Sequence, residues 1–431
     1  MGKVGNLLFW IFILFVHYIT VSSFLFVADG SGFFIEILQT QNFIIHEPLR
    51  QVARYITQFP LVLSLKLGVT NFSLLVLIFG LGHCLHTWLA IAAVYWFTGW
   101  QTAKRTMVIP LIMLIISSGF LISESFVVAS YSIIIGTGII NWRRLNTAKQ
   151  ILIAAICMLF INLYEGGFIN CTGLIIMALY HFSTDKLVQK PFNKFLQYLI
   201  VVLLTSNAAY MVFRAIVAPL NPNGAQIAEL DPWFYIAVTG FVALWWLVYK
   251  IYQSNQVVVT VLLISAVIGT QFIPYDIESA YTDRLLILLV PTAIMLAESV
   301  AFALKRFVYF KDSPAGEYKL VLGILSALLL LKTIPLVKHQ HFVARYCNDR
   351  IGVIPYVESR KLYAPAYELW WTNIYTSVIY QGFYYQKVNS IAGNPTTCSF
   401  CYNEQIPDTY PKLMRYHIFY ANGLTIKAKP Q

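Results

Sequence analysis

The chain has 431 residues, of which 58% are hydrophobic, 16% are aromatic and only 11% are charged. A soluble domain carries about 25% charged residues, so the composition excludes an ordinary soluble enzyme and predicts an all-α polytopic membrane protein. The formal net charge of +11 does not indicate a nucleic-acid partner, because basic residues at membrane boundaries and on anionic lipid headgroups account for it.

About eleven apolar stretches approach the length of roughly 20 residues with which a helix crosses a bilayer. In chain order they are Leu7–Val27, Asn71–Phe97, Thr106–Ile122, Phe126–Ile140, Ile151–Leu163, Phe168–Phe182, Phe195–Phe213, Trp233–Tyr252, Val257–Pro274, Leu285–Leu304 and Leu320–Val337. They predict a transmembrane domain over residues 1–337. A cleaved signal peptide is the alternative for the first stretch, which is long for an apolar signal segment of about 7 to 15 residues.

Basic residues favour one set of the alternating loops. If the N-terminus is cytoplasmic, the inner loops hold Lys3, Lys104, Arg105, Arg143, Arg144, Lys149, Lys186, Lys190, Lys194, Lys250, Lys305, Arg306, Lys311 and Lys319. The short outer loops then hold only Arg50, Arg54, Lys66, Arg214 and Arg284. This bias obeys the positive-inside rule, so a cytoplasmic N-terminus and an extracytoplasmic region over residues 338–431 are predicted.

Two regions outside the spans have their own character. In the first outer loop, residues 28–70, apolar residues recur at helical spacing, which predicts short amphipathic helices in the membrane interface. Pro48 and Pro60 are expected to start or break these helices. Residues 338–431 are rich in Tyr and Trp and lack a spanning stretch, which predicts a small region of mixed helix and strand.

Acidic residues gather on the predicted outer face. Asp29 follows the first stretch, whereas Glu124 and Glu165 lie in connections hardly longer than a tight turn. A partly desolvated carboxylate can act as a general base toward a hydroxyl. We therefore expect these three acids to converge as candidate catalytic residues; the alternative is that each acid only solvates its turn.

A ligand that carries phosphate also needs cations on the same face. Arg50 and Arg54 are four residues apart and share one helical face, while Arg214 and Arg284 lie at outer ends of predicted helices. Arginine can hold phosphate through two parallel hydrogen bonds. These four arginines and the nearby His46 are the candidate substrate-binding residues, although the arginines could instead pair with neighbouring acids or contact lipid headgroups.

A metal centre is not expected. His83 and His86 are three residues apart within one apolar stretch, but no third ligand lies nearby in the sequence. Helix packing is the favoured role for this pair. No cofactor is required, and although a divalent cation would be compatible with the chemistry, no ligand set supports one.

Several of these features together resemble the GT-C superfamily of integral-membrane glycosyltransferases. They are a short cytoplasmic N-terminus, the acid of Ala28-Asp29-Gly30 after the first stretch, an outer loop with interfacial helices, many crossings and an outer C-terminal region. The loop from His46 to Tyr55, followed by Gln58 to Leu63, is also similar to bacterial membrane proteins of this general type.

The resemblance implies a transferase of the cell envelope in the bacterial inner membrane. Its donor would be a polyprenyl-phosphate-linked sugar, its acceptor a glycan, lipid or protein, and its catalytic acid Asp29. The paired acid motif of the family is absent because Gly30 follows Asp29, which leaves Glu36 as the local substitute. The alternatives are a transporter or flippase for a lipid-linked glycan and a noncatalytic membrane assembly protein.

The predicted topology can be tested with single-cysteine variants at Ser183 and Asn389. A membrane-impermeant thiol reagent added to sealed cells should label position 389 and leave position 183 unlabelled until the cells are opened. Labelling of position 183 in sealed cells would contradict the topology.

Overall fold

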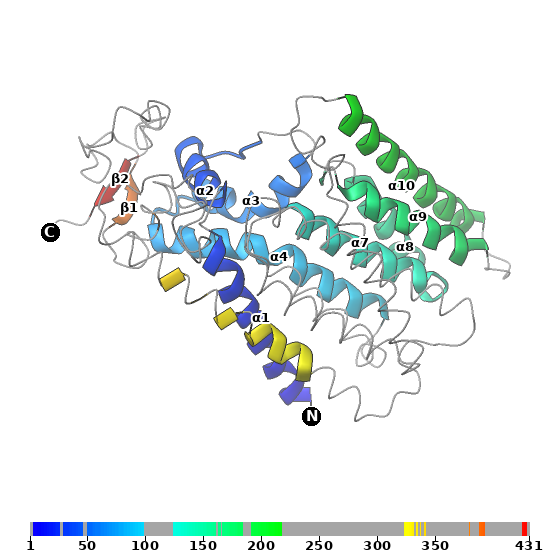
Figure 1. Ribbon diagram of the computed structural model, residues 1–431, viewed down its shortest axis with the longest axis horizontal. Helices are drawn as coiled ribbons and strands as arrows, with labels where there is room; N and C mark the ends of the chain where they lie inside the picture. Colours follow the sequence, from blue (N-terminus) through cyan, green and yellow to red (C-terminus); the bar gives the residue numbers. More distant parts are fainter. Residues whose placement is uncertain are drawn as a thin grey trace, which may run out of the picture.

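The computed structural model describes residues 3–25, 29–45, 50–98, 124–160, 163–164, 166–183, 191–217 and 323–331, positions 333, 334, 337, 340, 341 and 379, and residues 388–392 and 425–428. Within this part the protein is predominantly helical (Figure 1). The helical class predicted from the sequence is therefore confirmed. The predicted stretches at 106–122, 233–252, 257–274 and 285–304 lie outside the described residues.

Six of the described helices coincide with predicted apolar stretches. They are α1 (Lys3–Phe24), α4 (Phe72–Thr98), α7 (Glu124–Ile140), α8 (Thr147–Leu159), α9 (Gly167–Ser183) and α10 (Pro191–Val217). In the described part, two helices are long and apolar enough to cross a membrane, at Phe72–Phe97 and Pro191–Arg214, while the others contain shorter apolar runs. The full set of about eleven crossings stays a prediction.

The first two long helices run antiparallel. The Tyr18 hydroxyl of α1 donates to the Leu77 carbonyl near the start of α4, at 3.1 Å. At their opposite ends, the rings of Trp10 and Tyr95 meet edge to face with centroids 5.8 Å apart. An antiparallel pair is the arrangement expected of two consecutive membrane-spanning helices.

The later helices α7 to α10 lie side by side (Figure 1). The start of α9 lies near Val128 in the first turns of α7, since a Cβ on Gly167 would lie 3.5 Å from that valine. At the other end, the ring of Trp142, just after α7, lies 5.3 Å from the ring of Phe182. Helices α7 and α9 are therefore parallel, as two chain segments separated by one returning helix should be.

Two shorter helices occupy the predicted interfacial loop, α2 (Asp29–Thr40) and α3 (Gln51–Lys66). Phe34 of α2 packs against Phe72 and Phe79 of α4, with ring centroids 5.7 and 5.4 Å apart. The break predicted at Pro60 is wrong, because this proline lies inside α3. Its ring removes one backbone donor, but α3 continues since it packs along α4.

Residues near the C-terminus add a small ribbon and a helical segment. Strands β1 (Val388–Ala392) and β2 (Thr425–Ala428) pair antiparallel, and β1 lies against α4. Residues 323–331 are helical, and the hydroxyls of Thr20 in α1 and Thr333 lie 2.6 Å apart. The last predicted apolar stretch thus contacts the first.

Helices α3 and α4 approach closely at Gly82. A Cβ at this position would collide with the backbone carbonyl of Thr57, and backbone cannot move aside as cheaply as a flexible side chain. We therefore expect Gly82→Ala to destabilise the protein by about 1–3 kcal/mol, the usual cost of overpacking.

The matched control is Gly32→Ala in α2, where an added Cβ meets nothing within 4 Å. This variant should be neutral or more stable by up to about 1 kcal/mol, because alanine favours helix. Unfolding of the purified variants in one detergent measures both effects. Equal stability of the two variants would contradict the close packing at Gly82.

Candidate functional site

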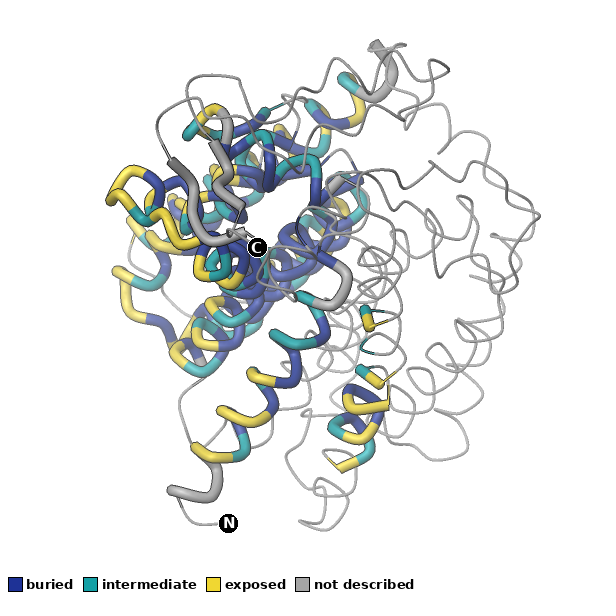
Figure 2. Tube along the Cα trace, turned by 90° about the vertical axis from the view of Figure 1, so that its left-hand side faces the viewer, coloured by how far each residue is buried: buried dark blue, intermediate teal, exposed yellow. Residues whose placement is uncertain are grey.

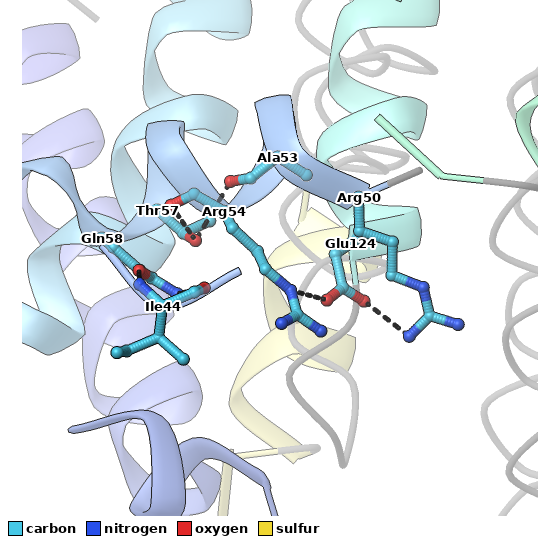
Figure 3. A network of polar contacts seen from close by, with 7 residues as sticks. All are labelled: Ile44, Arg50, Ala53, Arg54, Thr57, Gln58 and Glu124. Atoms are coloured by element: carbon cyan, nitrogen blue, oxygen red, sulfur yellow. Dashed lines mark hydrogen bonds and ion pairs between the residues drawn. The ribbon is translucent and has the colours of Figure 1, made fainter. Parts of the chain in front are cut away.

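Three charged side chains meet between α3 and α7. Arg50 immediately precedes α3, Arg54 lies one turn into it, and Glu124 is the first residue of α7. Nε of Arg54 donates to Oε1 of Glu124 at 3.3 Å, and Nη1 of Arg50 lies 3.7 Å from Oε2. Figure 3 shows the two guanidinium groups on either side of the carboxylate. Each oxygen of Glu124 thus faces one arginine.

The site is largely withdrawn from solvent. Arg50 is 7% exposed and Arg54 5% exposed, and the side chain of Glu124 is 15% exposed. Aromatic rings cover both cations, with the Arg50 guanidinium 5.1 Å from the centre of Tyr164 and that of Arg54 4.5 Å from Phe33. Such cation–π contacts contribute about 0.5–2 kcal/mol each and fix the plane of a guanidinium.

One donor in the site has no acceptor among the residues that the structure describes. Nη1 of Arg54 is buried and makes no hydrogen bond within the part of the chain that the structure describes. A buried polar group without a partner costs about 1–3 kcal/mol, and a charged group costs more. This atom marks the position at which an anionic oxygen would be bound most favourably.

Local structure explains why these residues meet. Arg50 is the N-cap residue of α3 and precedes Arg54 by four residues, about one helical turn, so both side chains lie on the same side of the helix start. Glu124 lies in the first turn of α7, where the helix dipole favours a negative charge. The start of α7 therefore supplies the carboxylate, and the start of α3 supplies the two cations.

Gln58 fixes the chain that leads into α3. Its Oε1 accepts from the Ile44 amide at 2.9 Å, and its Nε2 donates to the Ile44 carbonyl at 3.1 Å (Figure 3). Gln58 is 2% exposed. This pair of buried bonds holds the segment after α2 against the face of α3 that carries Arg54.

The two acids predicted in the first outer loop lie on α2. Asp29 is its first residue, one turn before Phe33, whose ring contacts Arg54. The side chain of Asp29 is outside the described part, so its backbone alone is placed near the site. Glu36 follows Phe33 by about one turn and is partly buried.

Arg214 lies at the same end of the helices. Met211, one turn before it in α10, packs beside the position where Gly167 begins α9. Nε of Arg214 is buried and has no hydrogen-bond partner among the described residues. The remaining predicted site residues, Glu165, His46 and Arg284, fall outside the described part.

Sequence reasoning missed Phe33, Gln58 and Tyr164. Gln58 follows Arg54 by four residues, a spacing that places both side chains on one face of α3 and could have indicated Gln58. Tyr164 precedes Glu165 in a tight turn but carries no motif that predicts a contact with Arg50. Aromatic partners of a buried arginine come from tertiary packing, which a single sequence does not show.

The histidines of α4 have packing and hydrogen-bond contacts. The His83 ring lies 4.8 Å from the ring of Phe79, and Nδ1 of His86 lies 3.1 Å from the Ser130 hydroxyl of α7. In the described ranges, no group of three or more His, Cys, Asp or Glu side chains could hold a metal ion. The visible contacts of His86 join α4 to α7.

Comparison of the chain with protein-family models, curated proteins and solved structures finds no match.

The role assigned to Gln58 can be measured as stability. Gln58→Met retains the side-chain volume but leaves the buried amide and carbonyl of Ile44 without partners, so a loss of about 2–4 kcal/mol in unfolding free energy is expected. Gln51→Met is the control, because Gln51 bonds the Tyr55 hydroxyl at an exposed site and should cost less than about 0.5 kcal/mol. Similar losses in both variants would show that the Gln58 bonds are not special.

Proposed function

We propose that the protein is an integral-membrane glycosyltransferase that takes a sugar from a polyprenyl-phosphate donor at the outer face of a bacterial inner membrane. The observation that carries the proposal is the buried pair Arg50 and Arg54 with an unsatisfied donor, directly beside the helix that begins with Asp29. Sugar transfer needs cations to stabilise the phosphate leaving group and a carboxylate to deprotonate the acceptor hydroxyl. These two kinds of residue must therefore lie close together.

The surface of α3 supports an apolar environment. Its exposed residues, at four-residue spacing and continuing to the residue after the helix, are Tyr55 (38%), Phe59 (54%), Leu63 (43%) and Leu67 (74%). Its opposite face buries Arg54, Thr57 and Gln58 together with Ala53, Leu61, Val62 and Leu65. A surface helix of a soluble protein turns mainly polar residues outward, whereas α3 exposes an apolar stripe. An interfacial helix with its apolar stripe in the lipid fits this distribution.

Other helices repeat the exposure of apolar residues. In α1, Leu7, Leu8, Ile11, Phe12 and Phe15 are each at least half exposed, and Figure 2 shows this exposed side near the N-terminus. Contact of these apolar side chains with lipid chains has no hydrophobic free-energy cost, whereas their exposure to water does. Together with the spans of α4 and α10, this favours a membrane domain.

The charges at the two ends of the helices support an orientation. Arg143 and Arg144 follow α7, and the Lys149 ammonium contacts the ring of Trp96 at the C-terminal end of α4. Glu124 lies at the opposite end of α7. By the positive-inside rule, the end with Arg143 and Arg144 is cytoplasmic, and Glu124 with its two arginines faces outward.

The reaction assigns different work to the two acids. Asp29 accepts the proton of an acceptor hydroxyl while that oxygen bonds to the anomeric carbon of the sugar. The bond from this carbon to the phosphate oxygen breaks, and polyprenyl phosphate leaves with the electron pair, its charge balanced by the arginines. Asp29 suits the base role better than Glu124, because both oxygens of Glu124 already face guanidinium groups.

Asp29→Asn tests the base directly. The variant should insert and bind donor normally but transfer sugar about a hundredfold to ten-thousandfold more slowly, the usual contribution of a positioned base. The assay is transfer of labelled sugar from a polyprenyl-phosphate donor in membranes with equal protein levels. Glu36→Gln is the control and should retain most activity. Normal transfer by Asp29→Asn together with loss in Glu36→Gln would move the base to Glu36.

A further inference from the structure

We propose that Arg50, Arg54 and Glu124 form a phosphate-binding site in which Glu124 is a positioning residue and Nη1 of Arg54 is the donor to the ligand. The inference deepens the proposed function, on which it rests only for the statement that the phosphate belongs to a lipid. Within the cluster, Glu124 holds the arginines in position and Arg54 donates to the ligand.

The geometry of Arg54 separates two functions within one side chain. Nε donates a hydrogen bond to Oε1 of Glu124 at 3.3 Å, and the guanidinium carbon lies 4.5 Å from the centre of the Phe33 ring. Nη1 is buried and makes no hydrogen bond among the described residues, although the whole arginine is 95% withdrawn from solvent. Folding thus positions a charged donor where no described residue accepts its hydrogen bond.

The chemistry of the cluster selects an anion with several oxygens. Two guanidinium groups surround one carboxylate, so these three side chains sum to one positive charge. Phosphate is a strong acceptor that arginine binds through parallel bonds. A neutral hydroxyl would satisfy the hydrogen bond of Nη1 but not the charge.

Glu124 has the contacts expected of a positioning residue. It lies on a different helix from the arginines, and its two oxygens each face one of them (Figure 3). Two guanidinium groups would otherwise repel each other and separate. The carboxylate therefore holds them side by side.

The binding experiment uses the purified full chain in detergent and three probes: inorganic phosphate, a polyprenyl phosphate, and the polyprenol of the same length. Binding is followed by tryptophan fluorescence and by the rise in the unfolding midpoint that a ligand of the folded state produces. The variants are Arg54→Lys and Glu124→Gln. The control is Arg144→Lys, an exposed arginine after α7 at the opposite end.

Arg54→Lys retains a positive charge for Glu124 but has no second planar nitrogen. It should fold and bind phosphate at least roughly tenfold more weakly, while Arg144→Lys binds like wild type. Glu124→Gln keeps an acceptor oxygen for Nε of Arg54 but removes the charge that holds the two guanidinium groups side by side, so phosphate should bind roughly tenfold more weakly.

The outcomes separate the site from the reaction. Unchanged phosphate binding in Arg54→Lys would overturn the site. Unchanged binding in Glu124→Gln with loss of sugar transfer would make Glu124 a base and overturn the positioning role. If Glu124→Gln does not fold, the Arg54→Lys result alone decides the phosphate site.

The three probes identify the source of the phosphate. Tighter binding of polyprenyl phosphate than of inorganic phosphate, with no binding of polyprenol, assigns the site to a lipid phosphate, whereas equal affinities assign it to free phosphate. Arg54-dependent phosphate binding without transfer from any polyprenyl donor would support the site and reject the transferase.

Discussion

The ion pairs between Glu124 and the two arginines of the α3 region are the constraint on which the arrangement of this end of the molecule depends. Taking charges out of water costs several kcal/mol for each ion, and close partners must offset that cost. Arg54 and Glu124 are 70 positions apart in the sequence, so the pair joins two segments that the chain does not place together. Any shift of α3 relative to α7 would leave a buried charge without its partner.

A second consequence concerns α3, which has to satisfy two environments at once. Its buried face carries Arg54, Thr57 and Gln58 together with Ala53, Leu61, Val62 and Leu65, and its exposed face carries aromatic and aliphatic side chains. The buried face approaches α4 closely at Gly82. The helix therefore keeps its buried polar groups apart from an exposed apolar stripe.

The parts of the fold that could be predicted from the sequence are those governed by local composition. The second apolar stretch was predicted at Asn71–Phe97, and α4 occupies Phe72–Thr98, because a long apolar run has few structural options. The pairing of Arg50 and Arg54 on one face followed from their spacing. The break expected at Pro60 does not occur, since local rules for proline do not include the packing of α3 on α4.

Contacts between distant segments were harder to predict. Topology placed Glu124 and the arginines on one face, but no sequence feature specified that they would pair rather than interact with lipid or neighbouring acids. Phe33 and Tyr164 illustrate the same limit, because aromatic residues are common throughout this chain and no local sequence feature marks those that contact a cation. Only the tertiary arrangement distinguishes the two rings that cover Arg54 and Arg50.

The same arrangement distinguishes Glu124 from Asp29, the acid proposed as the base. Glu124 lies between two guanidinium groups, one at each of its oxygens, and the base role is therefore proposed for Asp29. Asp29 begins α2 one turn before Phe33, and Phe33 in turn packs on Arg54. Packing of α2 on α3 therefore sets the separation between the proposed base and the proposed phosphate site, and the hydrogen bonds of Gln58 to Ile44 hold the connection between these helices in place.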